Sequence, residues 1–444
     1  MISVLQATAW YPPAHLGGTE VYLTGLVREL RDRGVLSRIV APLGLQQADG
    51  YEYDGATVRT YTVNPAPSRA EMRGQAPHTG FERFCQILAE ERPQIYHQHS
   101  WTRGLGAAHL QAAREAGIKT VLTIHTPNAI CLRGTMMQFG REACDGRIDP
   151  PICGACWSES RGAPESLARA LGAMPAGASR ALGGSLPESR LATALSAREL
   201  AERRREEFTR MVAAADRIVA VSGWLFDAFL RNGVPAEKLL LSRQGIDPAL
   251  AQQAARASSG RMRGSEPHFR LLYLGRWHPV KGVDVLVRAV RALPPQPSVT
   301  LSIHGVGEGI EERSYAATVR RLAAGDRRIA IHPPVPRERL ATALSEANAL
   351  AVPSFWLETG PLVVLEAQAA GLPVIGSRLG GIAELVREPE DGVLLPPGDV
   401  KAWAEAIRRI ACDEVQRARP RAPKKVRTMH EAAAEMAALY ASIQ

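Results

Sequence analysis

The sequence WLETGPLVVLEAQAAGLPVIGS, which runs from Trp356 to Ser377, decides the fold of this chain. The apolar residues 349–353 before it end in a proline and predict a buried strand. Pro361 stands where a helix can begin, because its fixed φ and missing N–H cost nothing at the first helical position. A Gly-Leu-Pro sequence at 371–373 ends that helix, and residues 373–375 predict the next strand of a parallel sheet.

Two carboxylates belong to this stretch. Glu358 follows the first strand, at the edge where open α/β sheets bind ligands. Glu366 lies inside the helix, where side chains lean toward the N-terminus, so both acids can approach the helix start. The backbone N–H groups of Gly360, Leu362 and Val363 and the helix dipole favour an anion there. A ligand with phosphates and hydroxyls suits this set, although a helix-start charge and a solvated helix face would also explain the two acids.

Strand and helix patterns alternate along the rest of the chain, which predicts two doubly wound, Rossmann-like parallel sheets. We expect an N-terminal domain at 1–250, a C-terminal domain at 265–412, and a basic tail at 413–444 whose helix returns to the first domain. The polar residues 252–267 read as the linker. Predicted strands are 2–6, 39–40, 58–63, 95–99, 120–125, 217–222, 269–274, 300–305 and 329–336, and predicted helices are 19–33, 81–91, 105–116, 199–213, 283–293, 400–410 and 430–443.

Composition narrows the class of protein. The chain has 444 residues, of which 45% are hydrophobic and 22% charged, as in globular proteins that bury their own cores. It contains no apolar run of about 18 residues and no signal-peptide pattern, so we expect a cytoplasmic protein. The net charge of +9 favours anionic partners. No helix-turn-helix, RNP or zinc-finger pattern accompanies this charge, so nucleic acid is not an expected partner.

Two further loops suit phosphate groups. Gly17 and Gly18 precede a helix after the first strand and let backbone N–H groups come close to a ligand, although glycine pairs often only form turns. Arg276 and Lys281 lie five residues apart on the loop after a strand that opens the second half. A planar guanidinium and an ammonium at this spacing suit a diphosphate, whereas two surface cations would be the simpler explanation.

Two histidines, His99 and His125, end neighbouring predicted strands on the ligand side of the first sheet. A lone histidine there is more often a structural residue than a functional one. Residues 161–190 are rich in Ala, Gly and Arg with apolar residues at helical spacing. They predict either a surface insert or a basic patch, within a helical insert at about 161–210, that rests on a membrane or a lipid-linked acceptor.

Four cysteines gather within a segment of about 126–160, at positions 131, 144, 153 and 156. In a cytoplasmic chain such a group indicates a metal site more readily than disulfides. Four thiolates suit tetrahedral zinc, with the close pair at 153 and 156 as the knuckle. An iron–sulfur cluster, a redox pair and unliganded thiols remain open alternatives. The predicted ligands are Cys131, Cys144, Cys153 and Cys156.

Taken in order, these motifs resemble the retaining family-4 glycosyltransferases, which have the GT-B fold. The resemblance rests on the Gly17-Gly18 loop, the Leu-Thr-Ile-His strand end at His125, the Gly-Arg-x4-Lys-Gly loop and the Glu-x7-Glu element. It implies that Arg276 and Lys281 bind the diphosphate of a nucleotide-sugar donor and that Gly18 faces it from across a cleft. It implies that Glu366 binds the ribose, and that Glu358 and His125 contact the transferred sugar. The base would be held near Val335.

The resemblance also implies an activity. It predicts transfer to a glycan or lipid-linked acceptor with retention of anomeric configuration, in surface polysaccharide or glycolipid assembly at the inner face of the cell membrane. No Asp-x-Asp metal motif is present, so no catalytic cofactor is expected beyond the donor substrate. Thr126 stands where the family usually has Asp, and Thr359-Gly360-Pro361 stands where many members have Gly-Phe-Gly. The alternatives are a related epimerase or phosphorylase, and a non-catalytic subunit that binds nucleotide-sugar.

Overall fold

The structure is a computed structural model that describes residues 1–13, 17–43, 50–64, 66, 68, 71, 78–102, 104–186, 189–259, 268–307, 309–413 and 422–444. The chain divides into two compact units, which are described separately. Unit 1 comprises Met1–Arg243 with Glu431–Gln444, and unit 2 comprises Gln244–His430. The predicted linker and basic tail lie partly outside the described residues.

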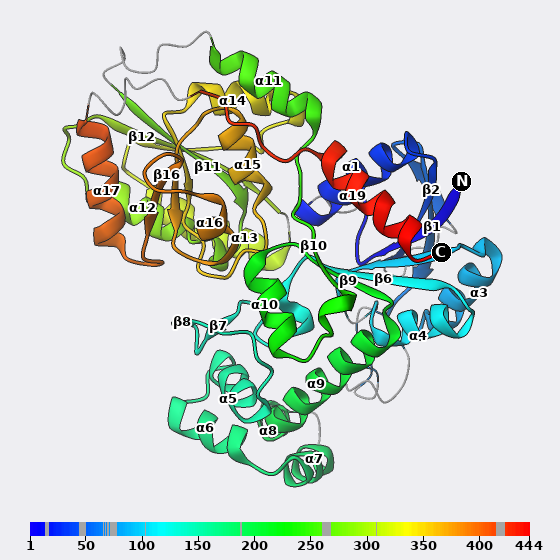
Figure 1. The fold of residues 1–444 in the computed structure, drawn as a ribbon. Coiled ribbons are helices and arrows are strands. Elements are labelled where there is room, and N and C mark those ends of the chain that lie inside the picture. Colours follow the sequence, from blue (N-terminus) through cyan, green and yellow to red (C-terminus); the bar gives the residue numbers. More distant parts are fainter. Residues whose placement is uncertain are drawn as a thin grey trace. The chain divides into compact units, whose positions relative to one another are not determined.

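Unit 1 alternates strands and helices, as its sequence pattern predicts (Figure 1). Its strands are β1 (Ile2–Thr8), β2 (Val35–Leu43), β3 (Gly50–Tyr53), β4 (Ala56–Thr62), β5 (Ile95–His99), β6 (Lys119–Ile124), β7 (Met137–Gln138), β8 (Glu142–Ala143), β9 (Arg217–Ala220) and β10 (Leu239–Leu241). Its helices are α1 (Gly18–Arg31), α3 (Phe81–Glu91), α4 (Ala107–Glu115), α5 (Pro150–Ser160), α6 (Glu165–Ala173), α7 (Ala176–Ser185), α8 (Arg190–Leu195), α9 (Ala197–Ala214), α10 (Gly223–Arg231) and α19 (Met429–Ser442), with 3₁₀ turns at Pro127–Ala129 and Ala236–Lys238.

The main sheet of unit 1 has the strand order β10-β9-β6-β5-β1-β2-β4-β3. Its pairings are parallel except for β3, which pairs antiparallel with β4 at the sheet edge. The chain runs from β1 outward through β2 to one side and then returns through β5 and β6 to the other. The direction therefore reverses between β1 and β5, and such a reversal opens a crevice at the carboxyl ends of the strands.

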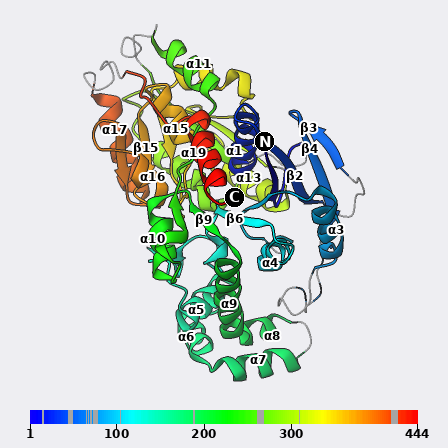
Figure 2. The same ribbon diagram turned by 45° about the vertical axis from the view of Figure 1, so that its right-hand side comes forward.

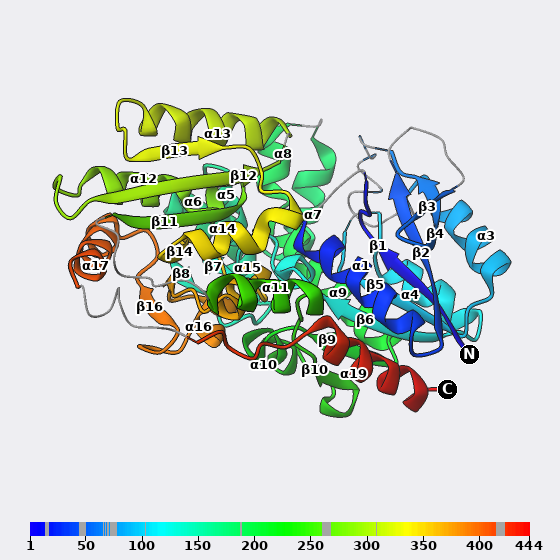
Figure 3. The ribbon, with the colours of Figure 1, turned by 90° about the horizontal axis from the view of Figure 1, so that it is seen from above.

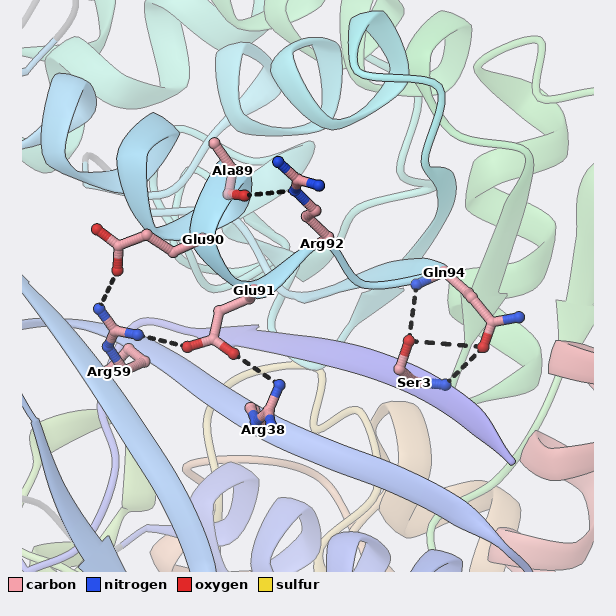
Figure 4. Close-up of polar contacts among 8 residues, drawn as sticks. All are labelled: Ser3, Arg38, Arg59, Ala89, Glu90, Glu91, Arg92 and Gln94. Carbon is pink, nitrogen blue, oxygen red and sulfur yellow. Dashed lines mark hydrogen bonds and ion pairs between the residues drawn. The ribbon is translucent and has the colours of Figure 1, made fainter.

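The other edge of this sheet, where the strands begin, is closed by polar contacts (Figure 4). The backbone N–H of Ser3 donates to Gln94 Oε1 at 2.9 Å, and the N–H of Gln94 donates to Ser3 Oγ at 3.0 Å. Glu91, at the end of α3, accepts from Arg38 of β2 at 2.8 Å and from Arg59 of β4 at 2.5 Å. These contacts tie α3 and the start of β5 to the sheet and leave the carboxyl edge for a ligand.

The segment predicted as a helical insert folds into short helices. Helices α5, α6, α7 and α8 gather around α9, as Figure 2 shows. Apolar side chains such as Leu171, which is 7% exposed, hold this group together. The small antiparallel pair β7–β8 precedes it. The insert is therefore a folded helical group rather than a loose surface segment.

Unit 2 repeats the alternation with a six-stranded parallel sheet in the order β13-β12-β11-β14-β15-β16. Its strands are β11 (Phe269–Arg276), β12 (Val299–Val306), β13 (Ile329–His332), β14 (Ala349–Val352), β15 (Val374–Ser377) and β16 (Gly392–Leu395). Its helices are α11 (Pro248–Ser259), α12 (Val283–Arg291), α13 (Ile310–Ala323), α14 (Leu340–Glu346), α15 (Leu362–Ala369), α16 (Gly380–Leu385) and α17 (Val400–Cys412), with 3₁₀ turns at Pro279–Lys281 (η3) and Arg337–Arg339 (η4).

Helices cover both faces of this second sheet (Figure 3). One apolar core joins α12, α13 and α17 to the strands and includes the fully buried Trp403. The other core joins α11, α14, α15 and α16 to the opposite face. Strands buried on both faces explain why β14 reads as an unbroken apolar run instead of an alternating one.

The predicted fold class, two Rossmann-like doubly wound sheets, is confirmed. Pro361 is the residue before α15 and not its first residue, so the helix begins one position later than predicted. The strand β3 was not predicted, because its Gly50-Tyr-Glu-Tyr sequence is too short and polar to show a pattern. No helix in the described ranges combines the length and the apolar character needed to cross a membrane.

Candidate active site

The carboxyl edge of the unit 2 sheet carries most of the predicted residues. The chain winds outward from β11 through β12 and β13, then crosses to β14 on the other side of β11. The switch therefore lies between β11 and β14. Arg276 ends β11, Lys281 ends the 3₁₀ turn after it, and Glu358 follows β14. The topology thus brings together loops that are about 80 residues apart in the chain.

Lys281 and Glu358 form a close ion pair. The ammonium donates to Glu358 Oε1 at 2.6 Å, and Ser354 Oγ donates to the same oxygen at 2.7 Å. The side chains are 18% and 7% exposed, respectively. Burial raises the pKa of Glu358, but Lys281 and Ser354 oppose this effect, and the net result is a pKa below its usual value. Glu358 is therefore held as a carboxylate against a cation in a largely dry place.

Gly282 allows the cationic loop to reach this acid. Its φ of +66° lies in the left-handed region, and a Cβ built there would come within 2.0 Å of the Pro353 carbonyl oxygen. The backbone N–H of Phe355 donates to the Val280 carbonyl at 2.7 Å. A residue with a side chain at 282 would be strained and would push the loop away from the end of β14.

The sequence did not reveal two supports of this site, Ser354 and the glycine pair at the start of α16. The N–H of Gly381 donates to the Glu358 carbonyl at 2.6 Å. A Cβ on Gly381 would come within 2.8 Å of that oxygen, and one on Gly380 equally close. A glycine pair shortly after β15 is the available signal in the sequence.

Around the pair, Arg276 supplies a second cation. In the described part of the chain, no hydrogen bond or ion pair engages its guanidinium. The α15 N-terminus lies on the same edge, and Gly360, Leu362 and Val363 are half-buried there. The structure therefore places two cations and a helix N-terminus at one sheet edge, which is an arrangement suited to a polyphosphate.

Glu366 occupies a different environment from Glu358. It is 9% exposed in α15, and burial raises its pKa to about 7, with Arg337 opposing the shift. Arg337 also pairs with Asp247 at 3.6 Å. Val335, the predicted base contact, is half-buried in the loop after β13. Glu366 thus changes charge near neutral pH and can accept hydrogen bonds from hydroxyls when ionised.

In unit 1, the glycine pair lies beyond β1. Gly17 is the N-cap of α1, and Gly18 is its first residue. A Cβ on Gly18 would meet no atom within 4 Å, and its φ is not positive, so neither packing nor backbone conformation requires glycine there. An open space beside a helix N-terminus fits an approach by a ligand. Residues 14–16 of this loop lie outside the described residues.

His125 directly follows β6 and is 3% exposed. Its Nε2 lies 3.0 Å from Nδ1 of His99, and its ring contacts Tyr22 with centroids 5.1 Å apart. Burial lowers the pKa of His125 to about 3, so it is neutral under physiological conditions. His99 belongs to the same buried polar cluster.

The predicted metal site is not supported. In the described ranges, which include every cysteine of the 131–156 segment, no three His, Cys, Asp or Glu side chains are placed to hold a metal ion. The thiols engage in local hydrogen bonds instead: Cys156 Sγ accepts from the Phe139 N–H at 3.2 Å. Burial raises the pKa of Cys144, of Cys153 to about 12, and of Cys156, and the neighbouring cysteines act in the same direction.

Two doubly wound, Rossmann-like domains are the architecture of the GT-B class, and comparisons with known proteins agree. The family model described as glycosyl transferase 4-like domain matches residues 17–245, and the model described as glycosyl transferases group 1 matches residues 268–413. The chain therefore belongs to this family of glycosyltransferases, and the resemblance seen in the sequence is confirmed.

Curated relatives include D-inositol 3-phosphate glycosyltransferases. That of Pseudarthrobacter chlorophenolicus is 25% identical over 90% of this chain and 83% of its own length. That of Xylanimonas cellulosilytica is 32% identical over 52% of this chain, a match that spans only 58% of the relative. Among solved structures, sucrose-phosphate synthase from Thermosynechococcus elongatus gives a TM-score of 0.67 at 20% identity, covering 100% of this chain and 99% of that one. HepE of Anabaena with UDP-glucose gives 0.58 at 18%, covering 100% and 97%.

Proposed function

We propose that this glycosyltransferase moves a sugar from a nucleotide-diphospho-sugar to a glycan or lipid-linked acceptor with retention of anomeric configuration. The observation that carries the proposal is the buried Lys281–Glu358 pair at the switch point of unit 2, with Arg276 on the adjacent strand end. Structures of the neighbour HepE with UDP and UDP-glucose support a donor of this class.

Each group then has a defined task. The leaving diphosphate gathers negative charge as the glycosidic bond breaks, and Arg276, Lys281 and the α15 N-terminus stabilise that charge without needing to reorganise. This set supports transfer that does not depend on a catalytic metal. Glu366 in its ionised form accepts hydrogen bonds from the ribose hydroxyls, and Val335 borders the base.

The sugar is positioned by Glu358 and His125 in this proposal. Glu358 is fixed by Lys281 and Ser354, and we propose that its carboxylate orients a hydroxyl of the sugar. We do not assign Glu358 as a nucleophile. In retention by same-face reaction, the leaving phosphate itself takes the proton from the acceptor hydroxyl, and the protein supplies alignment and charge stabilisation.

We place the acceptor in surface polysaccharide or glycolipid assembly, with peripheral contact to an anionic membrane. Exposed leucines on the insert helices support this setting: Leu167 is 51%, Leu182 46% and Leu191 62% exposed. The net charge of +9 acts in the same direction. Sedimentation with phosphatidylglycerol vesicles, compared with phosphatidylcholine vesicles, tests the contact. Equal binding of wild type and a Leu182→Ser/Leu191→Ser variant would refute it.

The activity is tested by screening UDP-, GDP- and ADP-sugars for binding and for release of nucleotide, with wild type and Glu358→Gln. We expect one preferred nucleotide, bound by both proteins and turned over at a useful rate only by the wild type. Acceptors should include inositol 3-phosphate, because curated relatives carry that name, and lipid-linked sugars.

Three other outcomes of this screen contradict the proposal. Binding without turnover, with every acceptor, would indicate a non-catalytic subunit. Turnover with phosphate or water alone would indicate a phosphorylase or an epimerase. Absence of nucleotide-sugar binding would overturn the diphosphate role of Arg276 and Lys281.

A further inference from the structure

The edge of the unit 2 sheet carries a pair of histidines that the proposed function does not use. β13 is the outermost of the described strands in that sheet and pairs with β12 (Figure 3). His304 of β12 and His332 of β13 stand opposite each other in this parallel pairing. Their rings are stacked, with centroids 4.9 Å apart and an angle of 21° between the ring planes. Two imidazoles therefore lie side by side near the carboxyl ends of two neighbouring strands.

The alternation of side chains along each strand puts this pair on the more open face of the sheet. In β12, Leu301 and Ile303 are buried in the core that α12, α13 and α17 also form, and Ile331 of β13 packs against that core. Side chains alternate between the two faces of a strand, so His304 and His332 point to the opposite face. On that face His304 is half-buried and His332 is exposed. The pair can therefore be reached from solvent.

The ring of His304 is fixed in its orientation and in its tautomer. Its Nδ1 lies 2.8 Å from the Pro333 carbonyl oxygen. A carbonyl oxygen only accepts, so Nδ1 carries the hydrogen, and in the neutral ring Nε2 has the lone pair. Histidines that bind metal ions usually have this arrangement, in which one ring nitrogen donates to a backbone carbonyl or a carboxylate and the other binds the ion. His304 is thus prepared to act as a ligand through Nε2.

His332 supplies the second ring of the pair. In the described part of the chain, no hydrogen bond or ion pair engages its imidazole, so its nitrogens are not committed to another group. Burial, and then the neighbouring His304, lower the pKa of His332. The ring is therefore neutral near pH 7, and the neutral imidazole is the form that binds a metal ion.

The strand positions around the pair carry no charge. On the same face lie Leu274 of β11, which is in register with His304, Ser302 of β12 and Ala330 of β13. Neither an anion nor a further cation therefore competes for the imidazoles at these positions. Within the described ranges no three His, Cys, Asp or Glu side chains are placed to hold a metal ion, so the protein would supply two ligands here and water the others.

We propose that His304 and His332 form a two-imidazole site for a divalent transition-metal ion of the class that favours imidazole, such as Zn²⁺, Ni²⁺ or Cu²⁺. The ion binds Nε2 of His304 and one ring nitrogen of His332, whose less restrained ring turns to meet it. The sheet holds the two ligands together before the ion arrives, so binding costs little conformational entropy. The site uses none of the candidate active-site residues, and the inference does not depend on the proposed function.

Isothermal titration calorimetry with NiCl₂ tests this site, in full-length protein without a polyhistidine tag. We expect His304→Gln and His332→Gln each to weaken nickel binding by about tenfold or more. The double variant should lose little beyond either single variant, because each change alone breaks the chelate. The matched control is His268→Gln, which changes an exposed histidine of the same unit and should leave the affinity unaltered. Wild-type affinity in either single variant, or an equal loss in the control, would overturn the proposal.

Thermal unfolding gives a second readout, which also shows whether each variant is folded. An ion that binds the folded chain raises the melting temperature as its concentration increases. We expect NiCl₂ to raise the melting temperature of the wild type and of His268→Gln by the same amount, and that of His332→Gln by less. MgCl₂ should not reproduce this difference, because Mg²⁺ prefers oxygen ligands. Equal nickel shifts in all three proteins would show that nickel binds elsewhere in the chain and would exclude the site.

Discussion

At the carboxyl edge of each sheet a buried polar side chain is held in place, by an ion pair in unit 2 and by neutral hydrogen bonds in unit 1. In unit 2, a buried carboxylate is held by a cation, Lys281, and by the hydroxyl of Ser354. In unit 1, the buried His125 is fixed by a neutral chain of hydrogen bonds that ends at an amide and a phenol. In the charged pair, the attraction between two residues keeps the side chain in place even when a third contact is lost. In the neutral chain, the loss of any one hydrogen bond affects the position of the residue at its end. The predictions below test this difference.

The largest effect is expected from Lys281→Met. It removes a cation proposed for the diphosphate and leaves Glu358 buried without its counter-charge, so we expect kcat/KM to fall about 10³-fold or more. The pKa of Glu358 should rise, because burial is then no longer opposed by the charge of Lys281. Lys401→Met, which changes an exposed lysine of α17, is the control for loss of charge. Comparable activity of the two variants would show that unit 2 does not use this pair.

Gly282→Ala is expected to have the next largest effect. The new methyl group would clash with the Pro353 carbonyl oxygen, and the residue would have a left-handed φ. We therefore expect the free energy of unfolding of unit 2 to fall by about 2–4 kcal/mol. Gly18→Ala in unit 1 meets open space and should change stability by less than about 0.5 kcal/mol. Urea unfolding measures both variants.

The same two glycine variants separate structural from ligand-related roles. If a ligand approaches the α1 N-terminus, Gly18→Ala should lose activity while keeping its stability. Gly282→Ala should lose both together. Full activity in Gly18→Ala would show that the open space beside Gly18 is not used by substrate.

Much of unit 2 could be predicted from the sequence because the residues of its candidate site lie in short sequence motifs. Arg276, Lys281, Glu358 and Glu366 each follow or open a recognisable element, and the doubly wound pattern placed them at one edge. Ser354 was missed because a serine after a strand has no pattern of its own. The glycine pair at 380–381 was missed because its role is to bring two backbones together, which the sequence alone does not show.

The contacts of the candidate site in unit 1 were harder to predict from the sequence, because they join residues that are far apart in the chain. His97 and His99 alternate with other residues in β5, which was a visible signal for a shared face, yet their partner Tyr440 lies more than 300 residues away. The cysteines show the reverse error. Their spacing suggested zinc, but spacing does not establish ligand geometry. In the described ranges no three His, Cys, Asp or Glu side chains are placed to hold a metal ion, although the four thiols lie near enough to interact electrostatically.

A change of pH should affect Glu366 in two opposite ways. Below a pKa of about 7 the carboxyl is protonated and cannot accept two ribose hydrogen bonds, so donor affinity should fall about tenfold from pH 8 to pH 6. Isothermal titration calorimetry at pH 8 and pH 6 measures this change in donor affinity. In Glu366→Gln the affinity should be lower at pH 8 and nearly flat with pH, and an unchanged pH profile would contradict the ribose role.

Stability of the ligand-free protein should change with the opposite sign. The folded carboxyl binds its proton more tightly than the unfolded one, whose pKa is 4.5, so the folded state loses stability as the pH rises from about 4.5 to 7. At pH 8 Glu366→Gln should therefore be the more stable protein, by up to about 3 kcal/mol. Thermal unfolding at pH 5 and pH 8 measures this. If Glu366→Gln is instead less stable than the wild type at pH 8, Arg337 stabilises the buried Glu366 carboxylate more than we expect of a side chain that is 46% exposed.

Ser354→Ala is expected to have the smallest effect, and it tests the comparison most directly. The variant removes one hydrogen bond to Glu358 Oε1 but leaves Lys281 on the same oxygen, so the acid stays charged and in place. We expect a loss of about 1 kcal/mol in stability and only a few-fold loss in kcat/KM. Ser345→Ala, in the same unit and also buried, controls for the loss of a hydroxyl that donates to a helix carbonyl. Because Lys281 supplies the counter-charge that holds Glu358, Lys281→Met should reduce activity much more than Ser354→Ala. The reverse order would mean that the Ser354 hydrogen bond, and not the ion pair, fixes the carboxylate.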